Sequence, residues 1–152
     1  MKILLRLIVI LAFSAWQGGF FFYATFVVPI GTEVLESAAQ QGAITQRVSN
    51  WLNVLGVIAL TLLAVDQIAV RPLRKSRWCV WLVTGLCHIY QLALHPWLDS
   101  QFDSTTTIIK DRPRFYFWHE TYLTVAGVQW FACLIAIWLL LVAWHRESKE
   151  TP

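Results

Sequence analysis

The stretch LLRLIVILAFSAWQGGFFFYATFVVP, from Leu4 to Pro29, decides the fold class of this chain. It is an apolar run in which Arg6 is the one charged residue. A run of about 18 or more such residues is long enough to cross a bilayer as an α-helix. Because the apolar core of a secretory signal peptide is shorter, we expect this segment to be an uncleaved first membrane span.

Three further apolar runs have lengths that suit a membrane helix, and they cover residues 51–70, 78–97 and about 118–144. The run 78–97 would extend about 29 Å as a helix, close to the thickness of the bilayer's hydrocarbon core. None of the runs alternates as a strand of an outer-membrane barrel would. The chain is therefore predicted to be one domain, residues 1–152, that forms an all-α integral membrane four-helix bundle with spans at about 4–29, 51–70, 78–97 and 118–144.

The composition supports this class. Hydrophobic residues make up 57% of the 152 residues and charged residues 14%, whereas soluble domains carry about 45–50% and about 25%. These values exclude a disordered chain, a disulfide scaffold and a nucleic-acid-binding arm. The expected partner is the lipid bilayer and no nucleic acid, and both a homo-oligomer and a complex with a partner membrane subunit stay open.

The charges are divided unevenly between the two ends of the predicted spans. With the N-terminus in the cytoplasm, the inner side holds eight basic and three acidic residues, and the outer side holds four basic and six acidic residues. The basic cluster Arg71–Arg77 lies in a short loop, where the excess of Lys and Arg on the cytoplasmic side is most informative. We therefore expect both termini in the cytoplasm and place the protein in a bacterial inner membrane.

Polar residues inside the predicted spans are the informative exceptions in such a chain. In the third span Thr84, His88, Gln91 and His95 follow steps of four, three and four, which puts them on one helix face. Because lipid cannot satisfy these groups, the polar faces of the four spans should meet inside the bundle. The predicted polar core, which either joins the helices or binds a small ligand or protons, consists of Gln17, Asn53, His88, Gln91, Tyr122 and Gln129.

Depth along the spans adds two expectations. Gln17, His88 and Gln129 each fall near the middle of their spans, so they could form one hydrogen-bonded layer at the membrane midplane. Arg6 and Asp66 both fall near the inner surface. They could pair with each other, although we favour an Arg6 side chain that extends to the headgroups.

Histidines near the outer surface raise a second hypothesis. His95 and His119 lie on different spans at similar depth, with Glu120 nearby, and imidazole and carboxylate groups suit a divalent or copper ion. Haem needs a strong donor on each face of the ring, and His88 has no partner His at its own depth. The alternative function is therefore a haem- or metal-handling redox membrane protein that uses His88, His95 and His119, while the favoured expectation is a protein without a cofactor.

Motifs of enzymes are missing from the sequence. It has no GxSxG, no HExxH, and no Gly-rich loop that could hold a phosphate. We expect a non-enzymatic protein with no catalytic residues. In the first loop, a short surface helix is predicted at about residues 33–41, ended by Gly42, with Thr45 as the cap of the second span.

Two patches resemble a known family. The first span and its end, Trp16–Tyr23 followed by Val27–Pro29, resemble the opening of the transmembrane-protein-205-like domain of unknown function, a family of small four-span membrane proteins. The segment Phe115–His119 is similar to the family's aromatic-then-His pattern before the last span, and Gln129 stands where the family tends to carry a polar residue. The layout also resembles, at greater distance, the copper-resistance D-type membrane proteins, although their Met-rich pattern is missing. The resemblance implies a four-span fold and no particular reaction.

Overall fold

A computed structural model of the chain describes residues 2–35, 37–103 and 108–150. It contains four long helical rods, and the predicted all-α class is confirmed. The first rod is continuous and consists of three parts, and the complete order is α1 (Lys2–Phe22), the π-helix η1 (Tyr23–Val27), α2 (Val28–Leu35), α3 (Ala38–Ala69), α4 (Arg74–Gln101), β1 (Phe102–Asp103), β2 (Ile108–Ile109) and α5 (Arg112–Glu150). The two short strands pair antiparallel between α4 and α5.

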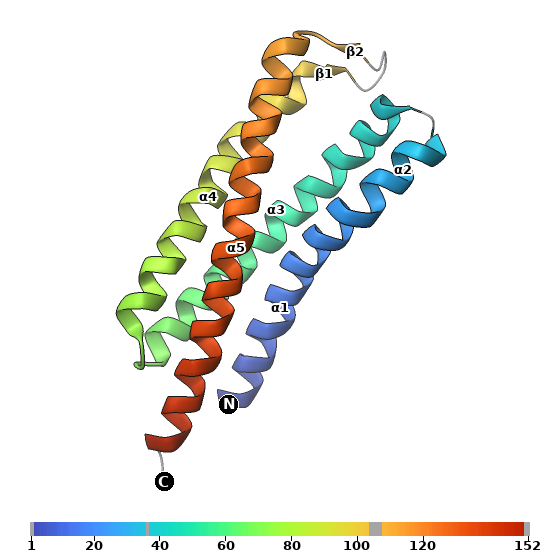
Figure 1. Cartoon of the computed structure of the whole chain (residues 1–152). Helices are drawn as coiled ribbons and strands as arrows, with labels where there is room; N and C mark the ends of the chain where they lie inside the picture. Colours follow the sequence, from blue (N-terminus) through green and yellow to red (C-terminus); the bar gives the residue numbers. More distant parts are fainter. Residues whose placement is uncertain (1, 36, 104–107, 151–152) are drawn as a thin grey trace.

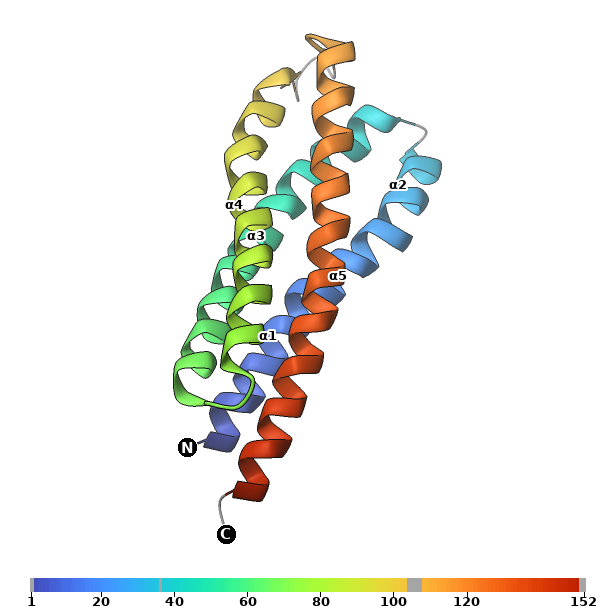
Figure 2. The same ribbon diagram turned by 60° about the vertical axis from the view of Figure 1, so that its left-hand side comes forward.

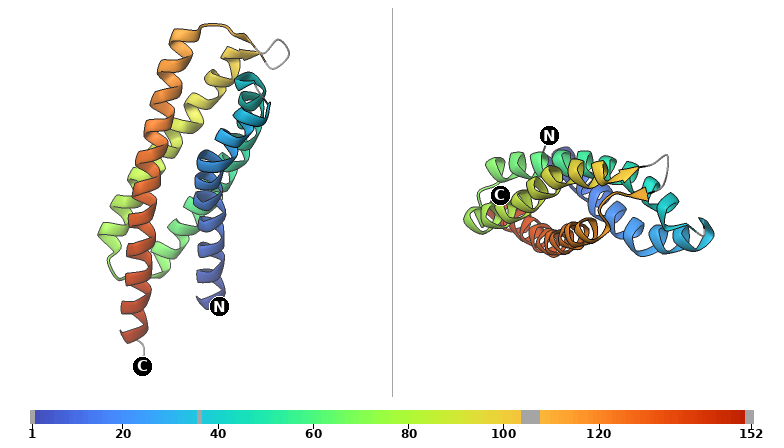
Figure 3. Two further views of the ribbon diagram at one scale, coloured as in Figure 1. Left: turned by 45° about the vertical axis from the view of Figure 1, so that its right-hand side comes forward. Right: turned by 90° about the horizontal axis from the view of Figure 1, so that it is seen from above.

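The rods pack in the order of the chain. α1 lies along α3, α3 contacts α4, and α4 lies along most of α5 (Figures 1 and 2). The N-terminal end of α1, the C-terminal end of α5 and the α3–α4 turn lie at one end of the bundle (Figure 1). At the other end, α2 and the start of α3 lean away from α5, which is clearest in the view from above (Figure 3). Both termini therefore lie at the end that carries the basic turn.

The first loop differs from the prediction. α2 ends at Leu35, and α3 begins at Ala38 and continues through Gly42, so Gly42 does not end a helix and Thr45 is not a cap. Ser37 is the N-cap of α3, and its hydroxyl accepts a hydrogen bond from the Gln40 amide at 3.3 Å. Serine provides this capping bond readily because its short side chain reaches the free amides of the first turn. The second rod is therefore about three turns longer at its start than the predicted span.

Hydrophobic side chains form a buried cluster between α1, α3 and α5 that includes Val9, Phe13, Trp16, Ala59, Leu60, Leu63, Cys133 and Leu140. A large number of Leu, Ile, Val and Phe side chains nevertheless stay on the outside of the bundle. Among the described residues, three helical stretches are long and apolar enough to cross a membrane: Ile3–Leu35, Gln40–Ala69 and Arg112–Lys149. α4, which contains the predicted third span, is not one of them.

The buried polar face of α4 explains why this helix is less apolar than the three stretches named above. Thr84, His88, Gln91 and His95 are all buried, as their spacing predicted, and so is Arg77 in the first turn. The exposed side of the same helix carries large apolar residues, with Leu86 65% and Ile89 63% exposed. α4 thus has its polar face inside the bundle and its apolar face outside.

Candidate polar-core site

His88 is the centre of the buried polar groups. Its side chain is 2% exposed, and its ring lies edge to face against Trp16 of α1, with the ring centroids 5.3 Å apart. His88 Nε2 lies 3.1 Å from the main-chain carbonyl of Asn53 in α3. Gly56, one turn further along α3, makes room for both rings, because an added Cβ would lie 2.4 Å from His88 Cε1 and 2.8 Å from Trp16 Cε2.

The carbonyl of Asn53 determines the form of the imidazole. A main-chain carbonyl can only accept a hydrogen bond, so Nε2 carries the proton and, in the neutral ring, Nδ1 is an acceptor. His88 Nδ1 is buried and lacks a partner among the described residues, as do the Oε1 atoms of Gln17 and Gln67. A buried acceptor without a partner costs about 1–3 kcal/mol. Each of these three atoms is therefore a place where a hydrogen-bond donor would bind favourably.

Gln129 joins α5 to α4. Its Oε1 accepts a hydrogen bond from Gln91 Nε2 at 2.9 Å, and its Nε2 donates to the main-chain carbonyl of Thr84 at 3.0 Å. The expected layer of Gln17, His88 and Gln129 is therefore not formed. The reason is direction around the helix: Gln91 faces α5, whereas His88 faces α3. Similar depth alone did not bring these side chains together.

Further polar side chains lie between His88 and the outer end of the bundle, on α4 and α5. The Tyr122 ring lies 6.3 Å from the ring of His95 between centroids. His95 Nδ1 in turn lies 3.0 Å from Asp99 Oδ2, one turn further along α4. Five of the six predicted polar-core residues, all except Gln17, thus take part in the contacts described for His88, Gln129 or His95.

The predicted metal ligands do not gather at one point. The ring of His119 stacks on Phe115 at 5.6 Å, and Glu120 is exposed. Residues 2–35, 37–103 and 108–150 contain no group of three or more His, Cys, Asp or Glu side chains that could hold a metal ion. The partners of His88, an indole and a main-chain carbonyl, are not the second strong donor that haem ligation requires. The described side chains of His95, His119 and Glu120 therefore do not fit a metal ion, and the surroundings of His88 do not fit a haem.

Charged residues form a second buried layer near the termini. Arg77 pairs with Asp66, and both side chains are at most 3% exposed. Arg77 also donates to the carbonyl of Val70 at 3.0 Å, and Trp144 Nε1 donates to Asp66 Oδ1 at 2.9 Å. This layer links α3, α4 and α5 near the α3–α4 turn.

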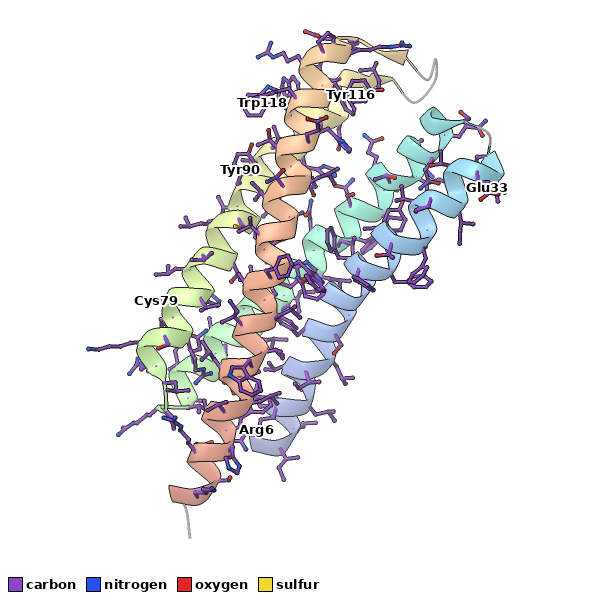
Figure 4. All side chains as sticks on the ribbon, viewed as in Figure 1. Arg6, Glu33, Cys79, Tyr90, Tyr116 and Trp118 are labelled. Atoms are coloured by element: carbon purple, nitrogen blue, oxygen red, sulfur yellow. The ribbon has the colours of Figure 1, made fainter. Side chains whose placement is uncertain are left out.

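Arg6 does not form the pair with Asp66 that we considered beside the favoured extension to the headgroups. Arg6 pairs with Glu147 of α5 rather than with Asp66, and its guanidinium lies 5.1 Å from the Trp144 ring centroid. Figure 4 shows Arg6 at the end of the bundle where the termini lie. α5 continues as a helix beyond the predicted span, and this extension brings Glu147 to Arg6.

Sequence reasoning missed two features of the site. Gly56 lies within the predicted second span, but nothing in the sequence around it indicates that it accommodates His88. The second feature is a polar contact of the first rod: Tyr23 of η1 bonds Thr45 at 2.9 Å and accepts from Gln41 Nε2 at 3.1 Å. The unusual glutamine pair Gln40–Gln41 was the available signal for it.

The chain was also compared with known proteins. No family model, no curated protein and no solved structure matches it. The resemblance to the transmembrane-protein-205-like domain therefore stays an expectation that rests on the two sequence patches alone.

Proposed function

We propose that this chain is a non-enzymatic, four-span integral membrane protein whose polar interior binds a small hydrogen-bond donor at His88. The two faces of α4 support the placement of this helix, the predicted third span, in the membrane. A helix at the surface of a soluble protein turns its apolar side inward. α4 does the reverse, with Leu86 and Ile89 outside and His88 inside, which is the arrangement favoured where the surroundings are lipid and polar groups must be satisfied internally.

The orientation follows from the charges and the position of the termini. The basic turn between α3 and α4 lies at the same end as both termini (Figure 1). The excess of Lys and Arg at this end favours the cytoplasmic side, and we propose a bacterial inner membrane. Reporter fusions test this: a tag at the C-terminus should be inaccessible from the outer side, whereas one inserted between α2 and α3 should be accessible.

The single observation that carries ligand binding is the free acceptor of His88. Nδ1 is buried and lacks a partner among the described residues, and its ring packs against Trp16 and against Gly56. The polar groups of Gln91 and Gln129, by contrast, satisfy each other. The simpler alternative is an ordered water that donates a hydrogen bond to Nδ1, because buried waters commonly satisfy polar groups that lack a protein partner.

Native mass spectrometry of the full chain released from lipid nanodiscs separates the two. A bound molecule should appear as an adduct of constant mass on the wild type and be lost from His88→Phe. Thr84→Val is the matched control, because Thr84 is as buried but its hydroxyl bonds only to a carbonyl of its own helix among the described residues, and it should keep the adduct. If the wild type carries no adduct above the mass of water, ligand binding at His88 is wrong.

The redox alternative has less support. It requires His95, His119 and Glu120 to meet, and the described side chains of these residues point to different surroundings. A visible spectrum and metal analysis of the purified protein test it directly. A Soret band, or stoichiometric copper, iron or zinc, would favour the alternative over the proposal.

A further inference from the structure

Ion pairs inside the bundle engage the acids whose side chains are described at the end that carries the termini. Asp66 pairs with Arg77, and both side chains are buried. Glu147 pairs with Arg6. Because each of these acids already faces a base of the interior, neither is a counter-charge reserved for the surface.

The exposed charged side chains described at this end are all basic. They come from the α3–α4 turn and from the last turns of α5, which lie at the same end of the bundle (Figure 1). We call them the basic surface: Arg71, Arg74, Lys75, Arg146 and Lys149. None of the five forms an ion pair or a side-chain hydrogen bond with a described residue. The side chains of Lys2 and Glu150 lie outside the described part of the chain.

The α3–α4 turn holds three of these bases on a fixed backbone. The buried Arg77 guanidinium donates to the carbonyl of Val70 at 3.0 Å. The Arg74 amide donates to the carbonyl of Arg71 at 3.2 Å. The Arg77 amide donates to the carbonyl of Leu73 at 3.0 Å, and Leu73 has a φ of 55°. A turn fixed in this way loses little backbone freedom when its side chains bind a partner.

With the bundle in a membrane, the turn lies at the depth of the lipid headgroups. Trp78 follows Arg74 by one helical turn and packs against Trp81 with the ring centroids 5.3 Å apart, and Trp side chains concentrate at the membrane–water interface. The first large apolar side chain exposed on α4 is Leu82, at 52%. The eight residues from Arg74 to Leu82 extend about 12 Å along a helix, so the bases of the turn lie outside the hydrocarbon region.

We propose that the basic surface binds the headgroups of anionic phospholipids in the cytoplasmic leaflet. A guanidinium donates two parallel hydrogen bonds to a phosphate group, and Arg71 and Arg74 present theirs to the outside. Clusters of Lys and Arg just beyond the end of a membrane helix are attracted to anionic lipid surfaces. The inference rests on the proposed membrane placement, and it is independent of a ligand at His88.

The outer end of the bundle also carries basic residues, but in different surroundings. Lys110 Nζ donates to the carbonyl of Ser100 at 2.8 Å. The Arg114 guanidinium lies 5.4 Å from the Trp97 ring centroid. Acids are exposed at the same end, namely Glu33, Asp111 and Glu120. These acids weaken the attraction of the outer bases for anionic lipid, so this end provides a matched control.

Native mass spectrometry of the full chain, released from nanodiscs of equal parts phosphatidylglycerol and phosphatidylcholine, tests the basic surface. The wild type should retain phosphatidylglycerol in about tenfold excess or more. The triple variant Arg71→Gln/Arg74→Gln/Lys75→Gln should lower this excess by about tenfold or more, since each base near an anionic surface contributes about fivefold in binding. The excess should also fall as the ionic strength of the nanodisc buffer rises, because salt screens exposed charges.

The control variant removes the same number of charges from the outer end: Lys110→Gln/Arg112→Gln/Arg114→Gln. It should keep most of the excess of phosphatidylglycerol. Equal retention of the two lipids by the wild type, or an equal loss in both triple variants, would overturn the proposal. Displacement of the lipid by free glycerol phosphate would reveal a site for a soluble phosphate compound and would also overturn it.

Flotation with phosphatidylcholine liposomes in a density gradient separates this inference from the proposed function. A chain that does not float would refute the membrane placement itself. A chain that floats but retains both lipids equally would leave the proposed function standing and would show that the basic surface does not select anionic headgroups.

Discussion

Replacing Gly56 with alanine tests the packing around His88. The added Cβ would lie 2.4 and 2.7 Å from two atoms of the His88 ring and 2.8 Å from Trp16 Cε2, closer than real Cβ atoms come to other groups. Both rings are buried, at 2% and 4% exposure, so neither moves aside without displacing its neighbours. Overpacking of this kind costs about 1–3 kcal/mol of unfolding free energy.

The control is Gly85→Ala in α4, where an added Cβ meets nothing within 4 Å. Both variants gain the same helix propensity, at most about 1 kcal/mol, so their difference in unfolding free energy isolates the overpacking term. We expect Gly56→Ala to be about 1–3 kcal/mol less stable than Gly85→Ala, measured by equilibrium unfolding in mixed micelles with circular dichroism.

A second measurement links the loss to His88. In a background of His88→Ala the imidazole is gone, and Gly56→Ala should then cost clearly less than it costs in the wild type, because the closest contact is removed. If Gly56→Ala is as stable as Gly85→Ala, or if its cost is the same with and without the imidazole, the described packing of His88 against α3 is wrong.

Three further predictions concern the links between helices, each measured by the same unfolding assay. Asp66→Asn should cost about 3 kcal/mol or more, since it leaves a buried guanidinium without its counter-charge, whereas Arg6→Gln at the more exposed pair should cost about 1 kcal/mol or less; equal losses would contradict the assigned burial. Gln129→Leu should cost about 1 kcal/mol for two interhelical hydrogen bonds of about 0.6 kcal/mol each, and a more stable variant would speak against them. Ser37→Ala should cost about 0.5–1 kcal/mol as the loss of the α3 N-cap, and a variant as stable as the wild type would contradict this cap.

Helix faces could be predicted from the sequence, and the reason is simple geometry. Residues three and four apart share a face whatever the helix packs against. The four polar residues on one face of α4 are therefore expected to be buried together. They are Thr84, His88, Gln91 and His95, and each is at most 7% exposed. The fold class followed in the same way from the length of the apolar runs, because each is long enough for one rod of the bundle.

Partners across the bundle could not be predicted, because depth along a span says nothing about direction around it. Gln129 and His88 lie at similar predicted depth, yet one bonds to α4 and the other to α3. Arg6 pairs with Glu147 and not with Asp66, because the helix α5 continues past the end of the predicted fourth span. A shallow apolar groove between the first rod and α5 is harder still to predict, because residues of the π-helix η1 and of a rod that is not its neighbour in the chain line it together.

The distribution of these contacts gives the four rods unequal roles. Hydrogen bonds and a buried ion pair join α3, α4 and α5 through Asn53, Asp66 and Gln129. In the described part of the chain, the first rod is joined to the others by Arg6 with Glu147 at one end and by Tyr23 with Thr45 and Gln41 further along. The buried face of α1 between them consists of Val9, Phe13, Trp16 and Gln17. In lipid, apolar packing distinguishes poorly between a neighbouring helix and the hydrocarbon chains. The stretch of α1 between these two links is therefore the part of the bundle that depends most on apolar packing. Two of the three buried acceptors without a described partner, on Gln17 and on His88 against Trp16, lie along this stretch, so a ligand at His88 exchanges with least disruption where this part of α1 moves.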